Sequence, residues 1–284
     1  MSCPTWWESR RKRTAVDRIY PPAGEMRLHR IWLPGAREGR TYSLDEDESH
    51  HLVTVMRRGE GDEVVVVAGE DRIYLGVIES VSGEGETSLV KVTVGEDYSS
   101  PPPPVRPWLV AVSVVKERNL ELAIRMLSET GLEGIIPLVS ERGQVSLKAG
   151  SGKTDRWKRI ALESAKQCGR ASLLDIRASI SIEELLAKEA GRDVWVAHPG
   201  GPELSCSAFL GTDGLRPSLF LIGPEGGFSA AEIALCEENG ARLVGFPMPV
   251  MRTPVAVMMI GALGVLVEMT AGRERADEDG VNSC

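Results

Sequence analysis

The chain contains 284 residues, of which 42% are hydrophobic and 26% are charged, and its formal net charge is −8. This composition is typical of a globular protein, and it excludes disordered and fibrous chains as well as strongly basic nucleic-acid coats. At roughly 150 residues per domain, the length predicts two domains.

Residues 1–25 contain a basic cluster with no apolar stretch after it, which argues against a secretory signal, and we expect a disordered extension there. Five scattered cysteines without a Cys-x-x-Cys pair argue against a zinc site and a disulfide framework, and favour a cytoplasmic location. The four histidines lack metal-ligand spacing, so we expect no metal. The apolar run 255–267 is shorter than the roughly 18 residues of a membrane span, so it predicts a buried helix and no membrane.

The first half of the chain predicts a small β-barrel over residues 26–98. Segments 63–68, 72–77 and 88–94 are rich in Val, Ile and Tyr and are separated by Gly-rich turns. One helix, from about residue 48 to 57 and capped by Asp45 or Asp47, interrupts the strands. Four consecutive prolines then predict a linker at 99–105, because proline removes backbone donors and favours an extended chain.

The second half changes pattern and predicts an α/β domain over residues 106–272, with a disordered tail at 273–284. Residues 108–115 form a continuous apolar run, as a strand buried on both faces requires. Helical spacing follows and ends at Gly131. Further strands are expected at 134–139, 193–197, 219–222 and 242–246, and further helices at 154–168 and 182–190. This alternation predicts a mainly parallel sheet covered on both sides.

The charge is unevenly distributed between these halves. Residues 26–97 carry a net charge of −7, whereas residues 142–170 carry +6. Such a basic stretch is compatible with a solvated helix face, and also with a surface that binds RNA phosphates. The residues alone leave both interpretations open.

The most informative segment is LFLIGPEGGFS at residues 219–229. A buried strand runs into a Gly-rich loop, and Ser229 with Glu232 forms a capping box for a helix that ends at Asn239-Gly240. The loop has neither a Walker sequence nor a Gly-x-Gly-x-x-Gly pattern. Because Glu225 suits a ribose hydroxyl or a cation better than a phosphate, the loop predicts a nucleoside-like ligand bound by backbone groups. An ordinary tight turn is the alternative.

Arg252 lies where the next strand leads into the apolar helix. Thr253 is a good N-cap and Pro254 suits the first helical position. We therefore expect Arg252 at the mouth of the site. Gly261 and Gly264 would allow close approach of a partner helix.

LIGPEGGFSAAEI at 221–233, followed by VMRT at 250–253, resembles the ribosomal RNA small-subunit methyltransferase E family, which are 16S rRNA (uracil-N3)-methyltransferases of the SPOUT class. MRLHRIWL, HHLVTVMR, LVSERGQV and RWKRIALESAKQCGR add support, so that the resemblance covers about residues 26 to 270. It implies an RNA-binding PUA-like β-barrel followed by a SPOUT-type α/β domain with a C-terminal trefoil knot. It further implies a homodimer that binds S-adenosyl-L-methionine and acts on a uridine of 16S rRNA in the small ribosomal subunit.

The resemblance also implies roles for individual residues. Those expected to bind the cofactor are His198, Pro199, Leu221, Ile222, Gly223, Pro224, Glu225, Gly226, Val250 and Met251. Arg252 is the expected catalytic residue, stabilising uracil oxygens as charge develops. Arg142 and Arg170 are expected to hold RNA phosphates.

The chain departs from the family pattern at the last motif. Where the family usually reads Leu-Arg-Thr-Glu-Thr-Ala, this chain has MRTPVA at 251–256, and PMP at 247–249 replaces Gly-Pro-Arg. Lys166 stands where an acidic residue is common. These departures leave two alternatives: a degenerate relative that binds rRNA as an assembly factor, or a SPOUT methyltransferase with another RNA target, such as a ribose 2′-hydroxyl or a tRNA base.

Overall fold

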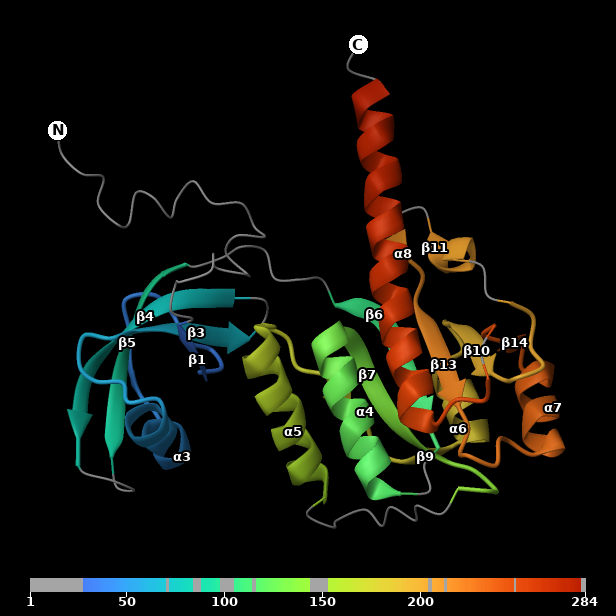
Figure 1. Ribbon diagram of the computed structural model, residues 1–284, viewed down its shortest axis with the longest axis horizontal. Helices are drawn as coiled ribbons and strands as arrows, with labels where there is room; N and C mark the ends of the chain where they lie inside the picture. The colour runs from blue at the N-terminus through green and yellow to red at the C-terminus, as the bar shows by residue number, and fades with distance from the viewer. Residues whose placement is uncertain are drawn as a thin grey trace. The chain divides into compact units, whose positions relative to one another are not determined.

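The computed structural model describes residues 28–69, 72–83, 88–97, 105–113, 116–143, 153–203, 206–211, 214–247 and 249–281 (Figure 1). They form two compact units that divide between Pro104 and Val105, inside the expected linker. Residues 165–172 belong to unit 1, and the rest of the chain after Pro104 belongs to unit 2. Our predictions for residues 1–25, 99–104 and 282–284, and for part of the basic stretch at 144–152, lie outside the described residues.

Unit 1 contains a five-stranded sheet in the order β1-β3-β4-β5-β2. Its strands are β1 (His29–Trp32), β2 (Thr41–Ser43), β3 (Glu63–Gly69), β4 (Arg72–Ser82) and β5 (Leu89–Asp97). The β1–β3 pair is parallel and the others are antiparallel. The core of this unit is formed by Leu52 and by side chains on one face of the sheet, Val64, Val66, Val92 and Val94, whereas Val65 and Val67 are buried on the other face.

The expected helix in unit 1 is present, with Asp45 as its N-cap. The Asp45 carboxylate accepts a hydrogen bond from Glu48 N at 2.8 Å. The α-helix is shorter than predicted, because α3 (Glu46–His50) continues as a π-helical turn, η1 (His51–Val55).

Residues 165–172 complete unit 1, which differs from the sequence-based domain assignment. They include the last residues of α5 (Lys153–Cys168). Ala171 packs against Val65 and Val67 on one side of the barrel sheet, and the ammonium group of Lys166 pairs with the Glu48 carboxylate. The sequence pattern placed these residues in the second domain because it shows that they continue a helix, but it does not show which unit the end of that helix contacts.

Unit 2 is built on a parallel sheet in the order β14-β10-β13-β6-β7-β8, with β9 also paired to β7. The strands are β6 (Arg106–Val112), β7 (Leu132–Val139), β8 (Asp175–Ile176), β9 (Ile180–Ser181), β10 (Asp193–Ala197), β13 (Ser218–Ile222) and β14 (Arg242–Val244). A small hairpin of β11 (Leu210–Gly211) and β12 (Gly214–Leu215) follows the short helix η3 (Cys206–Phe209).

Helices cover both faces of this sheet, as the alternating pattern predicted (Figure 1). One face carries α4 (Glu117–Thr130), α5 and α8 (Thr253–Val281), and the other carries α6 (Ile182–Lys188) and α7 (Ala230–Glu238). Trp108 and Val110 point to the first face, whereas Leu109 and Ala111 point to the second. Gly131, in a left-handed conformation, ends α4 as expected.

The C-terminal helix α8 differs from the prediction in two ways. It continues past residue 272 to Val281, because the sequence there contains good helix formers and no proline. Its window 253–270 is long and apolar enough to cross a membrane by length and composition alone, but 44% of that window is buried inside the structure. Its glycines serve contacts within the chain, since Gly261 lies against Thr130 and Gly264 against Trp108.

The buried side of α8 is matched by an exposed apolar stripe. Helical spacing brings together four side chains that are 41% to 57% exposed: Val255, Met258, Leu266 and Met269. Within the single chain, the helix predicted over residues 255–267 is therefore buried on only one face.

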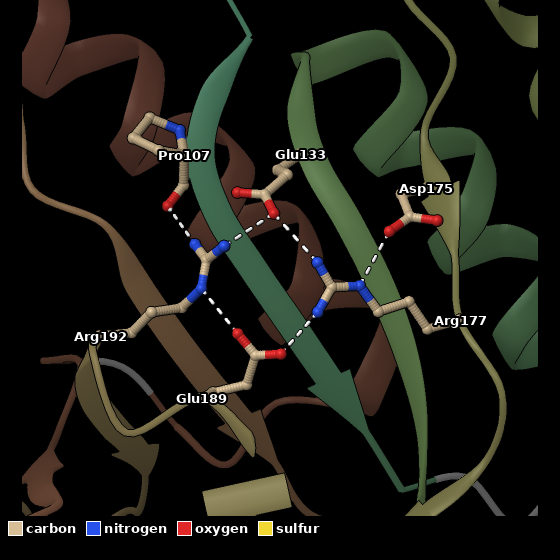
Figure 2. A network of polar contacts seen from close by, with 6 residues as sticks. All are labelled: Pro107, Glu133, Asp175, Arg177, Glu189 and Arg192. Atoms are coloured by element: carbon tan, nitrogen blue, oxygen red, sulfur yellow. Dashed lines mark hydrogen bonds and ion pairs between the residues drawn. The ribbon is translucent and has the colours of Figure 1, made fainter.

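A network of charged side chains joins the amino ends of the strands in unit 2 (Figure 2). Arg192 donates to Glu133 at 2.7 Å, to Glu189 at 2.8 Å and to the Pro107 carbonyl at 2.9 Å. Arg177 contacts the same two glutamates, and also Asp175 at 2.8 Å. Each of the three nitrogen atoms of both guanidinium groups donates to an acceptor, so the charged side chains at this end of the sheet pair with one another. We call it the closed end of the sheet.

Candidate active site

The Gly-rich loop lies at the carboxyl end of β13, the fully buried central strand. Gly227 has a φ of +68°, which favours glycine, and its N–H donates to the Pro224 carbonyl at 2.8 Å to close a turn. The predicted capping box is confirmed: the Ser229 hydroxyl accepts from Glu232 N, and Glu232 Oε2 accepts from Ser229 N at 2.7 Å. The loop therefore presents bare backbone above the start of α7.

Two neighbouring segments hold this loop. From the turn after β7, Arg142 Nη1 donates to the Gly226 carbonyl at 2.7 Å, and Glu141 N donates to Glu232 Oε1 at 2.8 Å. From the first turn of α4, Asn119 Nδ2 donates to Glu225 Oε1 at 3.1 Å. The loop thus has a fixed shape, and Glu225 keeps one carboxylate oxygen for a ligand.

The segments after β10 and β14 pass each other with only backbone between them. His198 N donates to the Val244 carbonyl at 2.9 Å, and Gly245 N donates to the Pro202 carbonyl at 2.8 Å. A Cβ atom on Gly245 would lie 2.4 Å from the Gly201 carbonyl oxygen. These glycines are required by close approach, and they bring His198 and Pro199 to the same edge as the Gly-rich loop.

The start of α8 corrects the predicted cap by one residue. Thr253 is the first helical residue, and the Arg252 carbonyl accepts from Ala256 N at 3.1 Å, so Arg252 occupies the N-cap position. The Thr253 hydroxyl instead donates to the Gly223 carbonyl at 3.5 Å, which links α8 to the Gly-rich loop. Arg252 is exposed beside this link, as expected for a residue at the mouth of the site.

Most predicted cofactor residues meet at this edge, but they differ in exposure. Leu221 and Ile222 are buried in β13, so only their backbone can face a ligand. Val250 is 78% exposed, and Met251 packs on the core below α8.

The predicted role of Arg170 is at odds with the structure. Its side chain is 6% exposed in unit 1, and Nη2 donates to Ser172 Oγ at 3.2 Å. A phosphate ligand must reach a guanidinium group from solvent, so this burial argues against a phosphate contact. Arg142 is exposed but already bound to Gly226, and the two arginines belong to different units.

The basic stretch is also less available than its net charge indicates. Lys153 pairs with Glu117 at 3.0 Å and Arg156 with Glu121 at 2.8 Å, both on α4. Lys158 and Arg159 are exposed on α5. Among the residues that the structure describes, no group of three or more His, Cys, Asp or Glu side chains could hold a metal ion.

Sequence reasoning missed Asn119, the second role of Glu232, and the Gly201–Gly245 crossing. Asn119 had a usable signal, since it lies in the first helical turn after a buried strand, and such turns meet ligands in parallel sheets. The Gly201–Gly245 crossing gave no usable sequence signal, because its two glycines are far apart in the chain.

The chain thus combines a small β unit with an α/β domain whose Gly-rich loop lies at the carboxyl end of a buried strand. Residues 101–264 match the RNA methyltransferase domain family, and residues 44–89 match the RNA methyltransferase PUA domain family. Because the first match covers more than half of the chain, the chain belongs to the RNA methyltransferase family.

Within that family, the chain is similar to ribosomal RNA small subunit methyltransferase E. It is 28% identical over 244 residues to the protein of that name from Bacillus subtilis, covering 83% of this chain and 94% of the relative. The Synechocystis protein of the same name is 29% identical over 232 residues, covering 78% and 73%.

Solved structures agree on the fold. A methyltransferase from Legionella pneumophila, in complex with SAM, has a TM-score of 0.72 at 24% identity and covers 85% of this chain and 97% of its own. Ribosomal RNA small subunit methyltransferase E from Neisseria gonorrhoeae, bound to S-adenosyl methionine, has a TM-score of 0.71 at 18% identity, covering 83% and 96%. The expected α/β fold with an N-terminal PUA domain is confirmed, and the C-terminal trefoil knot stays a prediction.

Proposed function

We propose that this protein transfers a methyl group from S-adenosyl-L-methionine to N3 of a specific uridine in 16S rRNA of the small ribosomal subunit. The observation that carries the proposal is the Gly-rich loop, held at the carboxyl edge of the sheet of an RNA methyltransferase domain. Relatives named ribosomal RNA small subunit methyltransferase E supply the substrate class.

The residues at this edge fit the proposed cofactor. S-adenosyl-L-methionine carries ribose hydroxyls, an adenine and an amino-acid group, but no phosphate. The loop offers backbone groups and the Glu225 carboxylate, which suit hydroxyl and amino donors. The Arg142 guanidinium group, which reaches this loop, already donates to its Gly226 carbonyl at 2.7 Å.

The backbone of 221–226 and the segments at 198–199 and 250–251 would hold this cofactor, which supplies an electrophilic methyl group when bound. Glu225, held by Asn119 at 3.1 Å, would accept from a ribose hydroxyl. Holding methyl donor and acceptor in line is the main contribution that the chain makes, and such positioning can lower a barrier by several kcal/mol.

The acceptor nitrogen lies on the Watson–Crick edge of uracil, so the uridine has to be unpaired before it reaches the site. Arg252 is exposed at the start of α8, beside the Thr253–Gly223 link. Its guanidinium group would stabilise the uracil oxygens as the N3 proton leaves and negative charge develops. Lys158 and Arg159, together with the PUA-like barrel, would contribute RNA contacts.

The proposal includes a homodimer that acts in the cytoplasm. The exposed apolar stripe of α8 supports a dimer, because burying four large side chains against a second copy removes them from water. Cys236 is a free thiol in the described part of the chain, which suits a reducing compartment.

The decisive experiment is mass spectrometry of 16S rRNA from a deletion strain, compared with the strain complemented by the wild-type gene or by Arg252→Ala. We expect one uridine to lose one methyl group on deletion, and the wild type alone to restore it fully. A methyl group missing from a ribose or from tRNA would reassign the target. Unchanged methylation together with no binding of S-adenosyl-L-methionine in calorimetry would favour the assembly-factor alternative. In single-turnover assays with saturating RNA, a full rate for Arg252→Ala would reject its role at the uracil oxygens.

A further inference from the structure

The turn after β7 is fastened to the Gly-rich loop by two separate hydrogen bonds. One runs from Arg142 Nη1 to the Gly226 carbonyl at 2.7 Å, and the other from Glu141 N to Glu232 Oε1 at 2.8 Å. The base of the turn is itself fixed, because the Ser140 and Ser113 hydroxyls lie 2.5 Å apart and Gly143 N donates to the Ser140 carbonyl at 3.1 Å. A fixed turn therefore holds the Gly-rich loop, whose glycines would otherwise leave the backbone free to adopt several conformations.

Arg142 reaches the loop through its stem as well as its head. A Cβ atom on Gly226 would lie 3.5 Å from Arg142 Cδ, so the arginine stem covers the side of the loop where Gly226 has no side chain. The guanidinium group then binds the carbonyl of the same residue. A charged donor of this kind restricts a glycine peptide more strongly than a neutral one.

Glu232 uses each of its carboxylate oxygens for a different backbone group. Oε2 accepts from Ser229 N at 2.7 Å and caps α7, while Oε1 accepts from Glu141 N at 2.8 Å in the neighbouring turn. Capping α7 needs only the first bond. The second bond joins the end of β7 to the end of the Gly-rich loop, which a helix cap does not require.

We propose that Arg142 and Glu232 are positioning residues that hold the Gly-rich loop in the shape that binds S-adenosyl-L-methionine, and that Arg142 does not serve as an RNA phosphate ligand. This inference rests on the proposed function. It changes the role that the sequence suggests for Arg142, because Nη1 of this exposed side chain donates to the Gly226 carbonyl of the loop.

The first test is calorimetry with S-adenosyl-L-methionine on the full chain carrying Arg142→Met or Arg142→Lys. Methionine keeps an apolar stem but has no donor, so we expect about fivefold weaker binding, the loss of one charge-assisted hydrogen bond near a surface. Lysine can still donate to the Gly226 carbonyl and should restore part of the affinity. Arg125→Met is the matched control, because Arg125 is exposed on α4 and forms no ion pair in the described part of the chain. It should bind like the wild type.

A second pair of variants separates the Glu232 carboxylate from the rest of the helix cap. Glu232→Gln leaves one carbonyl oxygen where two carboxylate oxygens accept from backbone N–H groups, whereas Ser229→Ala removes only the hydroxyl that accepts from Glu232 N and keeps both carboxylate bonds. We expect Glu232→Gln to weaken cofactor binding more than Ser229→Ala does. Equal losses would reduce the role of Glu232 to helix capping and overturn its part of the proposal.

The kinetic signature distinguishes positioning from general stability. Arg142→Met should raise the KM for S-adenosyl-L-methionine about fivefold while the KM for RNA and the melting temperature of the unliganded protein stay unchanged. Unchanged cofactor affinity with weakened RNA binding would overturn the proposal and return Arg142 to the RNA. If the wild type itself does not bind the cofactor, the proposed function fails instead, so the two failures can be told apart.

Discussion

The two ends of the parallel sheet in unit 2 use polar groups in opposite ways. At the amino end, Arg177 and Arg192 share Glu133 and Glu189, and the charges satisfy one another (Figure 2). At the carboxyl end, β10, β13 and β14 run into Gly-containing segments with bare backbone, and Glu225 keeps one carboxylate oxygen for a ligand. Among the described residues, the guanidinium nitrogens at the amino end all have acceptors, whereas the carboxyl end keeps a Glu225 oxygen and backbone groups for a ligand.

This difference shows how one sheet can use one end to stabilise the domain and the other end to bind a ligand. Strand ends in a parallel sheet gather polar groups at both edges, because the strands all run the same way. Where arginine and glutamate meet in a closed network, the edge ties four segments together. Where glycine allows two chain segments to touch, the edge becomes a surface that a nucleoside can approach.

The largest expected effect comes from Gly245→Ala at the carboxyl end of the sheet. The added methyl group would lie 2.4 Å from the Gly201 carbonyl oxygen, and backbone cannot yield as a flexible side chain does. We expect a loss of about 3 kcal/mol in unfolding free energy, together with loss of cofactor binding. Denaturant unfolding and calorimetry measure both.

Gly191→Ala is the control for this variant, since a Cβ atom there meets nothing within 4 Å and the change should be nearly neutral. A stable Gly245→Ala protein with normal cofactor affinity would show that the crossing does not shape the site.

A smaller effect is expected from Arg192→Met at the closed end. It leaves Glu133 and Glu189 partly buried and without one of their two arginines, which should cost about 2 kcal/mol of unfolding free energy. Cofactor affinity should not change, because the network lies at the opposite edge of the sheet. A parallel loss of affinity would contradict the separation of the two ends.

The smallest effect concerns an ion-pair cluster in unit 1 that responds to mild acid. Burial raises the pKa of the Glu48 carboxyl group, but contacts with His29 and Lys166 outweigh it, so the pKa lies below its usual 4.5. Burial and the charge of His29 lower the pKa of His51 below its usual 6.5. Both groups bind protons more readily when unfolded, so their stabilisation is complete above pH 6.5 and declines as the pH falls.

Intrinsic amide exchange slows in acid, so rates at different pH values are compared as protection factors. The protection factors of amides in β3 and β4 should therefore fall first below pH 6.5, and again as the pH falls from 4.5 through the lowered pKa of Glu48. Glu48→Gln should remove the second decrease and keep the first. If the variant and the wild type show the same pH profile, the Glu48 contacts do not stabilise unit 1.

Local patterns predicted most of the fold. Asp45, Gly131 and the Ser229–Glu232 box mark helix ends through contacts between near neighbours, so the sequence carries them directly. The Gly-rich loop was found in the same way. Features that depend on contacts between distant segments were not predicted. Arg170 is basic but buried in unit 1, and the hydrogen bond from Asn119 to Glu225 joins residues 106 positions apart.

Helix α5 has a consequence for any attempt to dissect the protein. Its residues up to Ser164 belong to unit 2, and the residues from Ala165 onward belong to unit 1. The chain therefore passes between the units at three points and not one. A fragment that stops at Pro104 would leave Val65 and Val67 without Ala171, so cleavage at the prolines cannot yield two complete, separately stable halves.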